Sequence, residues 1–191
     1  MKTVNENNPP VKIIHEGRVA EVGLLSIRYP TLDDASLMTH YINELSNENT
    51  FITFQGEQMT LEAEKNFLQS QVEKIKNKTS CMLLAFANDQ LVGIASVQSK
   101  DKIAAHVGIL GISISKEYRG KGVGKTLFRV LVEEAQKIKN LKVITLEVFA
   151  INTKAINLYE SFGFQEYGKL PQGVQYKGEF IDEILMYKNV G

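Results

Sequence analysis

The chain has 191 residues, of which 43% are hydrophobic and 23% charged, and its 22 basic and 22 acidic side chains give a formal net charge of zero. This composition is typical of a globular protein of one domain. It lacks the basic excess of nucleic-acid-binding proteins, although a balanced total can conceal a local basic patch. No apolar run approaches the roughly 20 residues that a membrane helix requires.

The single cysteine and the start of the chain indicate a cytoplasmic protein. Cys81 has no cysteine partner for an internal disulfide, which fits a reducing compartment. Its place in the apolar run Cys81–Phe86 predicts a core residue rather than a reactive thiol. Residues 1–10 are polar and lack the apolar centre of a secretory signal. We therefore expect a flexible tail over 1–10 and one domain over 11–191.

Two strands and two helices are expected before residue 80. Residues 11–14 and 19–27 predict strands around a turn at Glu16-Gly17. Thr31 precedes Asp33 and Asp34, acidic residues that favour the first turn of a helix. A second helix is expected over about 60–77. The apolar stripes of these helices include Leu37, Tyr41 and Leu45 in the first and Leu61, Phe67 and Leu68 in the second.

After residue 80, short apolar strands alternate with helices. The expected strands are 82–87, 91–97, 103–114, 143–149, 164–167 and 180–187, and the expected helices run from the glycine-rich loop to about 138 and over 153–162. Gly163 stands where a helix C-cap is expected, and Lys177-Gly178 predicts a turn between the last two strands. This order predicts one mixed α/β domain.

The segment Arg119-Gly120-Lys121-Gly122-Val123-Gly124 lies between a predicted strand and a predicted helix. Backbone N–H groups there, unobstructed by side chains, can cradle phosphate oxygens, and the positive end of the helix dipole adds to the attraction. Arg119, Lys121 and Lys125 can supply further positive charge. A simple tight connection is the alternative. Three glycines at alternate positions favour an anion site.

Two common phosphate-binding patterns do not fit this loop. The dinucleotide fingerprint G-x-G-x-x-G requires a third glycine where Lys125 stands. The nucleotide P-loop G-x-x-x-x-G-K-[ST] finds its end in Gly124-Lys125-Thr126, but its first glycine falls on Arg119. The nucleotide hydrolase is therefore only the third interpretation of this chain.

A third pattern fits. Arg119, Gly122 and Gly124 occupy the fixed places of [R/Q]-x-x-G-x-[G/A], the acetyl-CoA signature of the GNAT N-acetyltransferases. Upstream, Leu110–Tyr118 resembles the splayed central strand of that family, and downstream, Leu146–Phe164 resembles its second motif. The chain therefore resembles the GNAT family, and its second motif is similar to that of ribosomal-protein alanine N-acetyltransferases.

The resemblance implies an α/β (α+β) fold with a central, mixed, largely antiparallel twisted sheet flanked by about four helices. It implies an acetyl-CoA-dependent acyltransferase without a metal, which acetylates a primary amine of a small molecule or a protein N-terminus. The cofactor-binding residues that it implies are Ile112, Ser113, Ile114, Arg119, Gly120, Lys121, Gly122, Val123, Gly124, Lys125, Asn152 and Tyr159. Asn152 also suits a helix N-cap, and the two roles are compatible.

The resemblance also implies two catalytic residues. Tyr159 would protonate the departing CoA thiolate; its helical spacing alone favours a packed aromatic. Glu147 would accept the proton of the attacking amine; a solvated position on the outer face of a strand is an equal alternative. His106 is the second candidate base, because its ordinary pKa suits proton transfer near neutrality; an edge or core histidine without a catalytic role is the commoner alternative. His15 and His40 lie outside the motifs and receive no role.

The acceptor site is expected between the first two helices and the last hairpin. Glu44, Glu48, Phe51 and Phe54 are candidates to line it, and the polar segment 170–177 is expected as its rim. Within the family a homodimer is plausible, and no nucleic-acid or membrane partner is expected. The alternative to an enzyme is a CoA-binding regulatory domain without catalysis.

Overall fold

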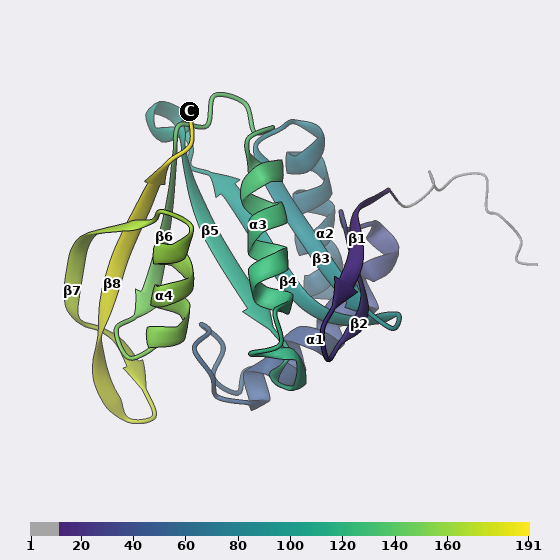
Figure 1. Ribbon diagram of the computed structural model, residues 1–191, viewed down its shortest axis with the longest axis horizontal. Coiled ribbons are helices and arrows are strands. Elements are labelled where there is room, and N and C mark those ends of the chain that lie inside the picture. The colour runs from purple at the N-terminus through teal and green to yellow at the C-terminus, as the bar shows by residue number, and fades with distance from the viewer. Residues whose placement is uncertain (1–11) are drawn as a thin grey trace, which may run out of the picture.

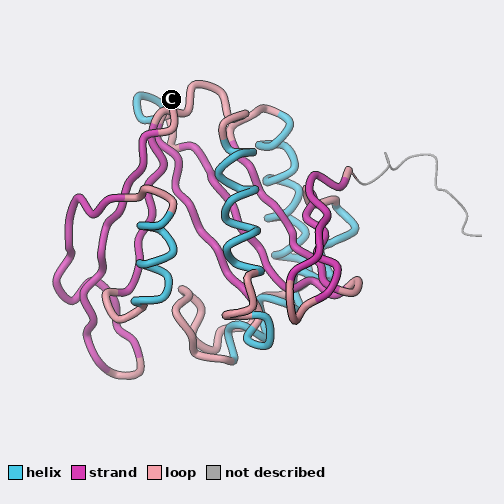
Figure 2. The backbone as a smooth tube through the Cα atoms, in the orientation of Figure 1, coloured by secondary structure: helices cyan, strands magenta, loops and turns pink. Residues whose placement is uncertain are grey.

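The computed structural model describes residues 12–191. The expected N-terminal tail, 1–10, and Val11 lie outside the described residues. Eight strands form one sheet in the order β1-β2-β3-β4-β5-β6-β8-β7 (Figures 1 and 2). The strands are β1 (Ile13–Val19), β2 (Gly23–Arg28), β3 (Ser80–Ala87), β4 (Gln90–Ser99), β5 (Val107–Ile114), β6 (Val143–Phe149), β7 (Gln165–Tyr176) and β8 (Glu179–Asn189).

Four α-helices cover the two faces of this sheet. They are α1 (Ala35–Asn47), α2 (Leu61–Lys76), α3 (Val123–Ala135) and α4 (Thr153–Ser161). Figure 1 shows α3 and α4 on the face toward the viewer and α1 and α2 behind the sheet. The larger core lies under α3 and α4 and includes Phe128 and Leu146, whereas a second core under α1 and α2 includes Met38 and Leu84. The expected mixed sheet with four helices is confirmed.

Local sequence explains several element boundaries. Thr60 caps α2, since its hydroxyl accepts a hydrogen bond from the Ala63 N–H at 3.2 Å. Asn88 and Asp89 both have positive φ, 50° and 63°. Positive φ at both central residues is the geometry of the tight turns that join antiparallel strands, and these two residues connect β3 to β4.

Only β5 and β6 pair in parallel among the strands of the described sheet. Their pairing covers Val107–Ile109 of β5 and Val143–Thr145 of β6. Beyond it the two strands diverge (Figure 1), while β4 continues to pair with β5 as far as Ile114. The sheet is therefore open between the second halves of β5 and β6.

Three sequence-based boundaries are wrong. The first turn lies at 20–22, where Glu21 has φ 66°, and not at Glu16-Gly17, because β1 pairs with β2 through Gly17 and Leu25. The third strand begins at Val107 rather than at Ile103, which is 96% exposed in a short 3-10 turn. The strand expected over 164–167 continues as β7 to Tyr176, so it includes most of the segment 170–177 expected as the rim of the acceptor site. Its pairing with β8 is interrupted between Leu170 and Val174.

The apolar stripes of the first two helices are only partly correct. Tyr41, Leu45 and Leu68 are buried, as expected. Leu37, Leu61 and Phe67, by contrast, are each more than 40% exposed. No helix within residues 12–191 is long and apolar enough to cross a membrane.

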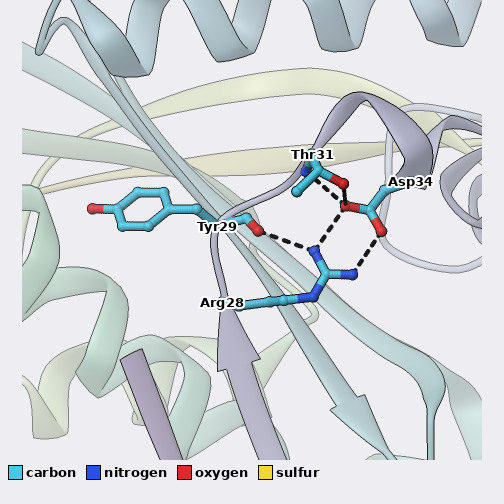
Figure 3. A network of polar contacts seen from close by, with 4 residues as sticks. All are labelled: Arg28, Tyr29, Thr31 and Asp34. Atoms are coloured by element: carbon cyan, nitrogen blue, oxygen red, sulfur yellow. Dashed lines mark hydrogen bonds and ion pairs between the residues drawn. The ribbon is translucent and has the colours of Figure 1, made fainter. Parts of the chain in front are cut away.

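A largely buried ion pair fixes the start of the first helical segment (Figure 3). The guanidinium of Arg28 at the end of β2 donates to both carboxylate oxygens of Asp34, at 2.8 and 2.6 Å. Asp34 also accepts from the backbone N–H and the hydroxyl of Thr31, at 2.7 and 3.0 Å. Burial alone would raise the pKa of Asp34, but these hydrogen bonds outweigh it and hold the pKa below its ordinary value.

Candidate active site

The opening between β5 and β6 exposes backbone to a possible ligand. Residues 110–114 of β5 pair with β4 on one edge, and no strand within residues 12–191 pairs with the other edge. An added Cβ on Gly111 would meet nothing within 4 Å. Unpaired backbone donors and acceptors on a strand edge can bind an extended, amide-bearing ligand.

The glycine-rich loop lies at the mouth of this opening, between the end of β5 and the start of α3. Gly122 precedes the first residue of α3 with φ 87°, and Gly120 has φ 76°, both in the region that favours glycine. The first N–H groups of a helix have no intrahelical acceptor, so those of Val123 to Lys125 are free to bind an anion. Lys121 and Lys125 are exposed beside them.

The side chain of Arg119 contacts other protein groups and does not point into the loop's proposed anion site. Its Nε donates to the carbonyl of Ile114 at 2.8 Å, and its Nη2 lies 2.6 Å from Oε2 of Glu48, the residue that follows α1. The second contact is close as an ion pair but poorly aligned as a hydrogen bond. The first residue of the loop therefore ties β5 to the end of α1.

The three β5 residues expected at the cofactor arm lie along the open edge. Ile112 and Ile114 pack against the core under α3 and α4. Ser113 faces the other side of the sheet, where its Oγ lies 3.0 Å from the hydroxyl of Tyr41 on α1. The side chains of all three are thus held by protein contacts, and the carbonyl of Ile114 already accepts from Arg119. The remaining backbone groups that point away from β4 are the part available to a ligand.

Tyr159 lies on the α4 side of the opening. It is 8% exposed, and its ring lies 5.4 Å from that of Phe128 and 6.3 Å from that of Phe164. Burial raises the pKa of Tyr159 to about 12, so its phenol stays protonated at neutral pH. The packing expected from its helical spacing is present, and the group is also in the protonation state that a proton donor requires.

Asn152 is the N-cap of α4. Its Oδ1 accepts a hydrogen bond from the Ala155 N–H at 3.3 Å. The capping role weighed from the sequence is therefore observed.

Glu147 lies on the opposite face of the sheet from α4. Its neighbours Leu146 and Val148 are buried in the core under α3 and α4, whereas Glu147 is exposed, as alternation along a strand requires. Leu185 is its cross-strand partner on β8, and Glu183 pairs with Phe149 on the same face. Burial, and then the charge of Glu147, raise the pKa of Glu183. Glu183 was not anticipated from the sequence, because only the β6–β8 register brings it beside Glu147.

Three aromatic rings stand beside these carboxylates. Phe51, Phe149 and Tyr176 have ring centroids 5.2 to 5.6 Å apart. Tyr176 also donates its hydroxyl to the carbonyl of Asn49 at 2.9 Å, which joins the last hairpin to the segment after α1. Phe149 was missed in the sequence, where it reads as an ordinary strand residue.

The other expected acceptor residues differ in their position. Glu48 lines a hollow of about 170 Å³ together with Arg119 and Tyr176. Phe54 is half-buried in the same segment. Glu44 instead faces solvent, with its Oε1 3.2 Å from Nε2 of His40.

His106 lies far from the loop. It is exposed and immediately precedes β5, at the end of that strand opposite to Ile114. Eight residues of extended chain span roughly 26 Å, so the structure does not bring His106 together with Tyr159 and Glu147. Among residues 12–191 no group of three or more His, Cys, Asp or Glu side chains is placed to hold a metal ion.

Known proteins share this architecture. Residues 39–164 match the model of the acetyltransferase (GNAT) family. A GNAT-family acetyltransferase structure from Streptococcus pneumoniae is 32% identical, covers 87% of this chain and 99% of its own, and superimposes with a TM-score of 0.81. A ribosomal-protein-alanine N-acetyltransferase structure from Brucella melitensis is 29% identical over 85% of this chain and 98% of its own, with a TM-score of 0.73.

Curated relatives match over shorter segments. Spermine/spermidine N(1)-acetyltransferase of Bacillus subtilis is 33% identical over 46% of this chain and 56% of its own length. N-acetylaspartate synthetase of Danio rerio is 34% identical over 50% of this chain and 33% of its own. The chain thus spans about a third to about a half of the curated relatives that it matches here.

Proposed function

Because this chain belongs to the acetyltransferase (GNAT) family, we propose that it transfers an acetyl group from acetyl-CoA to a primary amine. The amine nitrogen attacks the thioester carbonyl, the carbon–sulfur bond breaks, and the thiolate leaves. One proton is lost by the amine and one is gained by the thiolate. We treat residues 11–191 as a single N-acetyltransferase domain, and the buried free thiol of Cys81 supports a cytoplasmic location.

The unpaired edge of β5 carries this proposal. It lies directly before the glycine-rich loop, so an extended amide-bearing arm along Ile112 to Ile114 would bring its phosphates to the N-terminus of α3. Gly120 to Lys125 would bind the pyrophosphate through backbone N–H groups and the charges of Lys121 and Lys125. Arg119 would act indirectly, by fixing the loop to Ile114 and Glu48.

The two catalytic candidates lie on opposite sides of the opening. Tyr159, on the α4 side, holds its proton and would donate it to the developing thiolate. Glu147, on the exposed face, would accept a proton from the amine, directly or through water. A reacting carbonyl between β5 and β6 would then have a proton donor on one side and an acceptor on the other.

The acceptor side favours a positively charged amine. Glu147 and Glu183 place two carboxylates on one face, and Phe149 and Tyr176 add aromatic rings that attract cations. An acceptor with a carboxylate beside its amine would be repelled there. Among the substrate types in the relatives' names, this favours a polyamine such as spermidine over aspartate.

Release of free thiol from acetyl-CoA tests the activity. The purified chain is offered spermidine, single amino acids and peptides with a free N-terminal alanine, and thiol release is followed at fixed acetyl-CoA. Release with at least one amine is expected, fastest with spermidine. Tight acetyl-CoA binding without release to any amine would favour the regulatory domain instead. Mg²⁺-dependent binding of a nucleoside triphosphate without acetyl-CoA binding would contradict both.

A further inference from the structure

A hollow on the described surface lies away from the candidate active site. It has a volume of about 380 Å³ and is formed by the segment after α2, the connection from β4 to β5, and the segment after α3. Because α3 begins at the glycine-rich loop and this hollow lies beyond its other end, the two sites are about 20 Å apart along the helix axis. In Figure 1 the ends of α2 and α3 lie at the top of the view and the start of α3 lies near the bottom.

The lining is strongly basic. It contains four lysines, Lys74, Lys100, Lys102 and Lys139, against one acidic residue, Asp101. None of these lysines is among the ion pairs found within residues 12–191, which engage Lys137 and Lys169 instead. A chain with no net charge therefore concentrates unpaired positive charge around this hollow. Mutual repulsion of these lysines would be relieved by a bound anion.

Only part of this charge has a structural explanation. Lys74 stands in the last turn of α2, where a cation complements the carbonyl end of the helix. Lys100 and Lys139 lie in connections outside the α-helices, and Lys102 begins a short 3-10 turn. Lys102 moreover has φ 53°, a conformation that is unfavourable for a non-glycine residue.

An unpartnered hydroxyl lies in the same wall. Oγ of Ser99 is buried from solvent and has no hydrogen-bond partner within the described chain, and Ser99 lines the hollow. A buried hydroxyl without a partner is unfavourable. A ligand with acceptor oxygens would satisfy it.

We propose that this basic hollow, defined by Ser99, Lys100, Lys102 and Lys139, binds a small anion that carries phosphate. Lysine ammonium groups bind phosphate oxygens as point charges, and a pyrophosphate-sized group offers enough acceptors for three lysines and one hydroxyl. The volume of about 380 Å³ leaves room for a further small moiety, so inorganic pyrophosphate and a phosphorylated metabolite share the required chemistry.

Calorimetric titration of the full chain with sodium pyrophosphate tests this proposal. The titration is made with and without saturating CoA, so that pyrophosphate bound at the glycine-rich loop, where CoA would compete, is distinguished from pyrophosphate bound at the basic hollow. In saturating CoA, one bound pyrophosphate per chain is expected. The double variant Lys100→Gln/Lys139→Gln should bind it at least about a hundredfold more weakly, since each charged contact contributes roughly tenfold. Ser99→Ala should weaken binding by roughly three- to tenfold.

The matched control carries the same loss of charge elsewhere. Lys12→Gln/Lys65→Gln replaces two exposed lysines outside the hollow and should leave the affinity within about twofold. An equal loss of pyrophosphate affinity in both double variants would show that only the overall charge of the protein matters, and this would overturn the proposal. So would the absence of heat in the wild type, or binding of a single-stranded oligonucleotide without binding of pyrophosphate. Parallel titrations with adenosine diphosphate and ribose 5-phosphate distinguish an inorganic ligand from a phosphorylated metabolite.

Discussion

The guanidinium of Arg119 lies 2.6 Å from the carboxylate of Glu48, and this ion pair joins the first residue of the glycine-rich loop to the end of α1. The next residue, Asn49, accepts a hydrogen bond from Tyr176 of the last hairpin. Residues 48–49 therefore contact both the glycine-rich loop, through Arg119, and the proposed acceptor site, through Tyr176. We accordingly expect Glu48 to act as a positioning residue for both proposed substrates.

Replacement of Glu48 should weaken the binding of both substrates. In Glu48→Gln the ion pair is lost while the length of the side chain is kept. Because the pair is partly solvated, with side-chain exposures of 37% and 20%, we expect a loss of about 1 kcal/mol, or roughly a fivefold rise in each KM, with kcat little changed. Steady-state kinetics with each substrate varied in turn measures this, and Glu73→Gln on the outer face of α2 is the control. A rise in the KM of only one substrate would show that Glu48 does not position both.

Removal of the Tyr159 hydroxyl should slow the chemical step. Tyr159→Phe keeps the ring that packs against Phe128 and Phe164 but has no proton to donate. We expect kcat to fall by roughly a hundredfold or more with acetyl-CoA affinity and thermal stability nearly unchanged. Tyr187→Phe, which removes an exposed hydroxyl bonded to Gln165, is the control. Equal losses of affinity and turnover in Tyr159→Phe would show that the hydroxyl is structural.

The pKa of Tyr159 sets a further expectation for this variant. A phenol with a pKa of about 12 remains protonated through the range in which enzymes are assayed. Any fall in wild-type activity between pH 8 and pH 10 should therefore arise from another group. A basic limb that is present in the wild type and absent in Tyr159→Phe would contradict this assignment.

The ion pair of Arg28 and Asp34 should determine the acid stability of the fold (Figure 3). The folded-state pKa of Asp34 lies below its unfolded value, so its stabilising contribution is present above about pH 4 and is lost as the pH falls through the folded pKa. Asp34→Asn leaves the Arg28 guanidinium without its counter-charge and should lower the free energy of unfolding by about 3 kcal/mol at pH 7. Urea denaturation between pH 3 and pH 7 measures both effects.

A second variant separates charge from geometry in this pair. Arg28→Lys keeps the positive charge but cannot form the two parallel hydrogen bonds to Asp34. It should lose less stability than Asp34→Asn and retain most of the dependence on pH. Identical losses at pH 3 and pH 7 for Asp34→Asn would show that the carboxylate charge is irrelevant.

Much of the fold followed from the sequence because its signals are local. The strand 143–149 was predicted at its observed bounds, and Thr60, Asn152 and Gly163 stand at helix ends as their side chains or backbone freedom require. The first turn was misplaced at Glu16-Gly17 because glycine is the stronger local turn signal. Pairing of β2 with β3 through Leu25 and Ala87 sets the actual register, and that contact is distant in sequence.

The same distinction applies to the sites. The glycine-rich loop is contiguous and was recognised from six residues. Glu183 joins Glu147 only through strand pairing, and the basic hollow gathers Lys74, Lys100 and Lys139 from three separate segments. Neither the pair nor the hollow has a sequence motif, because only the folded chain brings these residues together.

Replacement of Glu147 should lower the activity of the protein and slightly raise its stability. Glu147 is the proposed proton acceptor, so Glu147→Gln should lower kcat/KM by roughly a hundredfold to a thousandfold. The charge of Glu147 adds to burial in raising the pKa of Glu183, so ionised Glu183 opposes folding above that pKa. Glu147→Gln removes one of the two like charges. The variant should therefore be less active and slightly more stable at pH 7.

Two measurements separate these effects of Glu147. Carboxyl NMR titration should place the pKa of Glu183 closer to its ordinary value in Glu147→Gln than in the wild type, and the thermal midpoint should not fall. Glu62→Gln, in the exposed first turn of α2, should change neither the pKa of Glu183 nor kcat/KM. The contrary outcome is that Glu147→Gln retains full activity while the pKa of Glu183 moves as expected. The two carboxylates would then interact as described, but Glu147 would contribute only to the negative charge of the acceptor site. Proton removal from the amine would then belong to water.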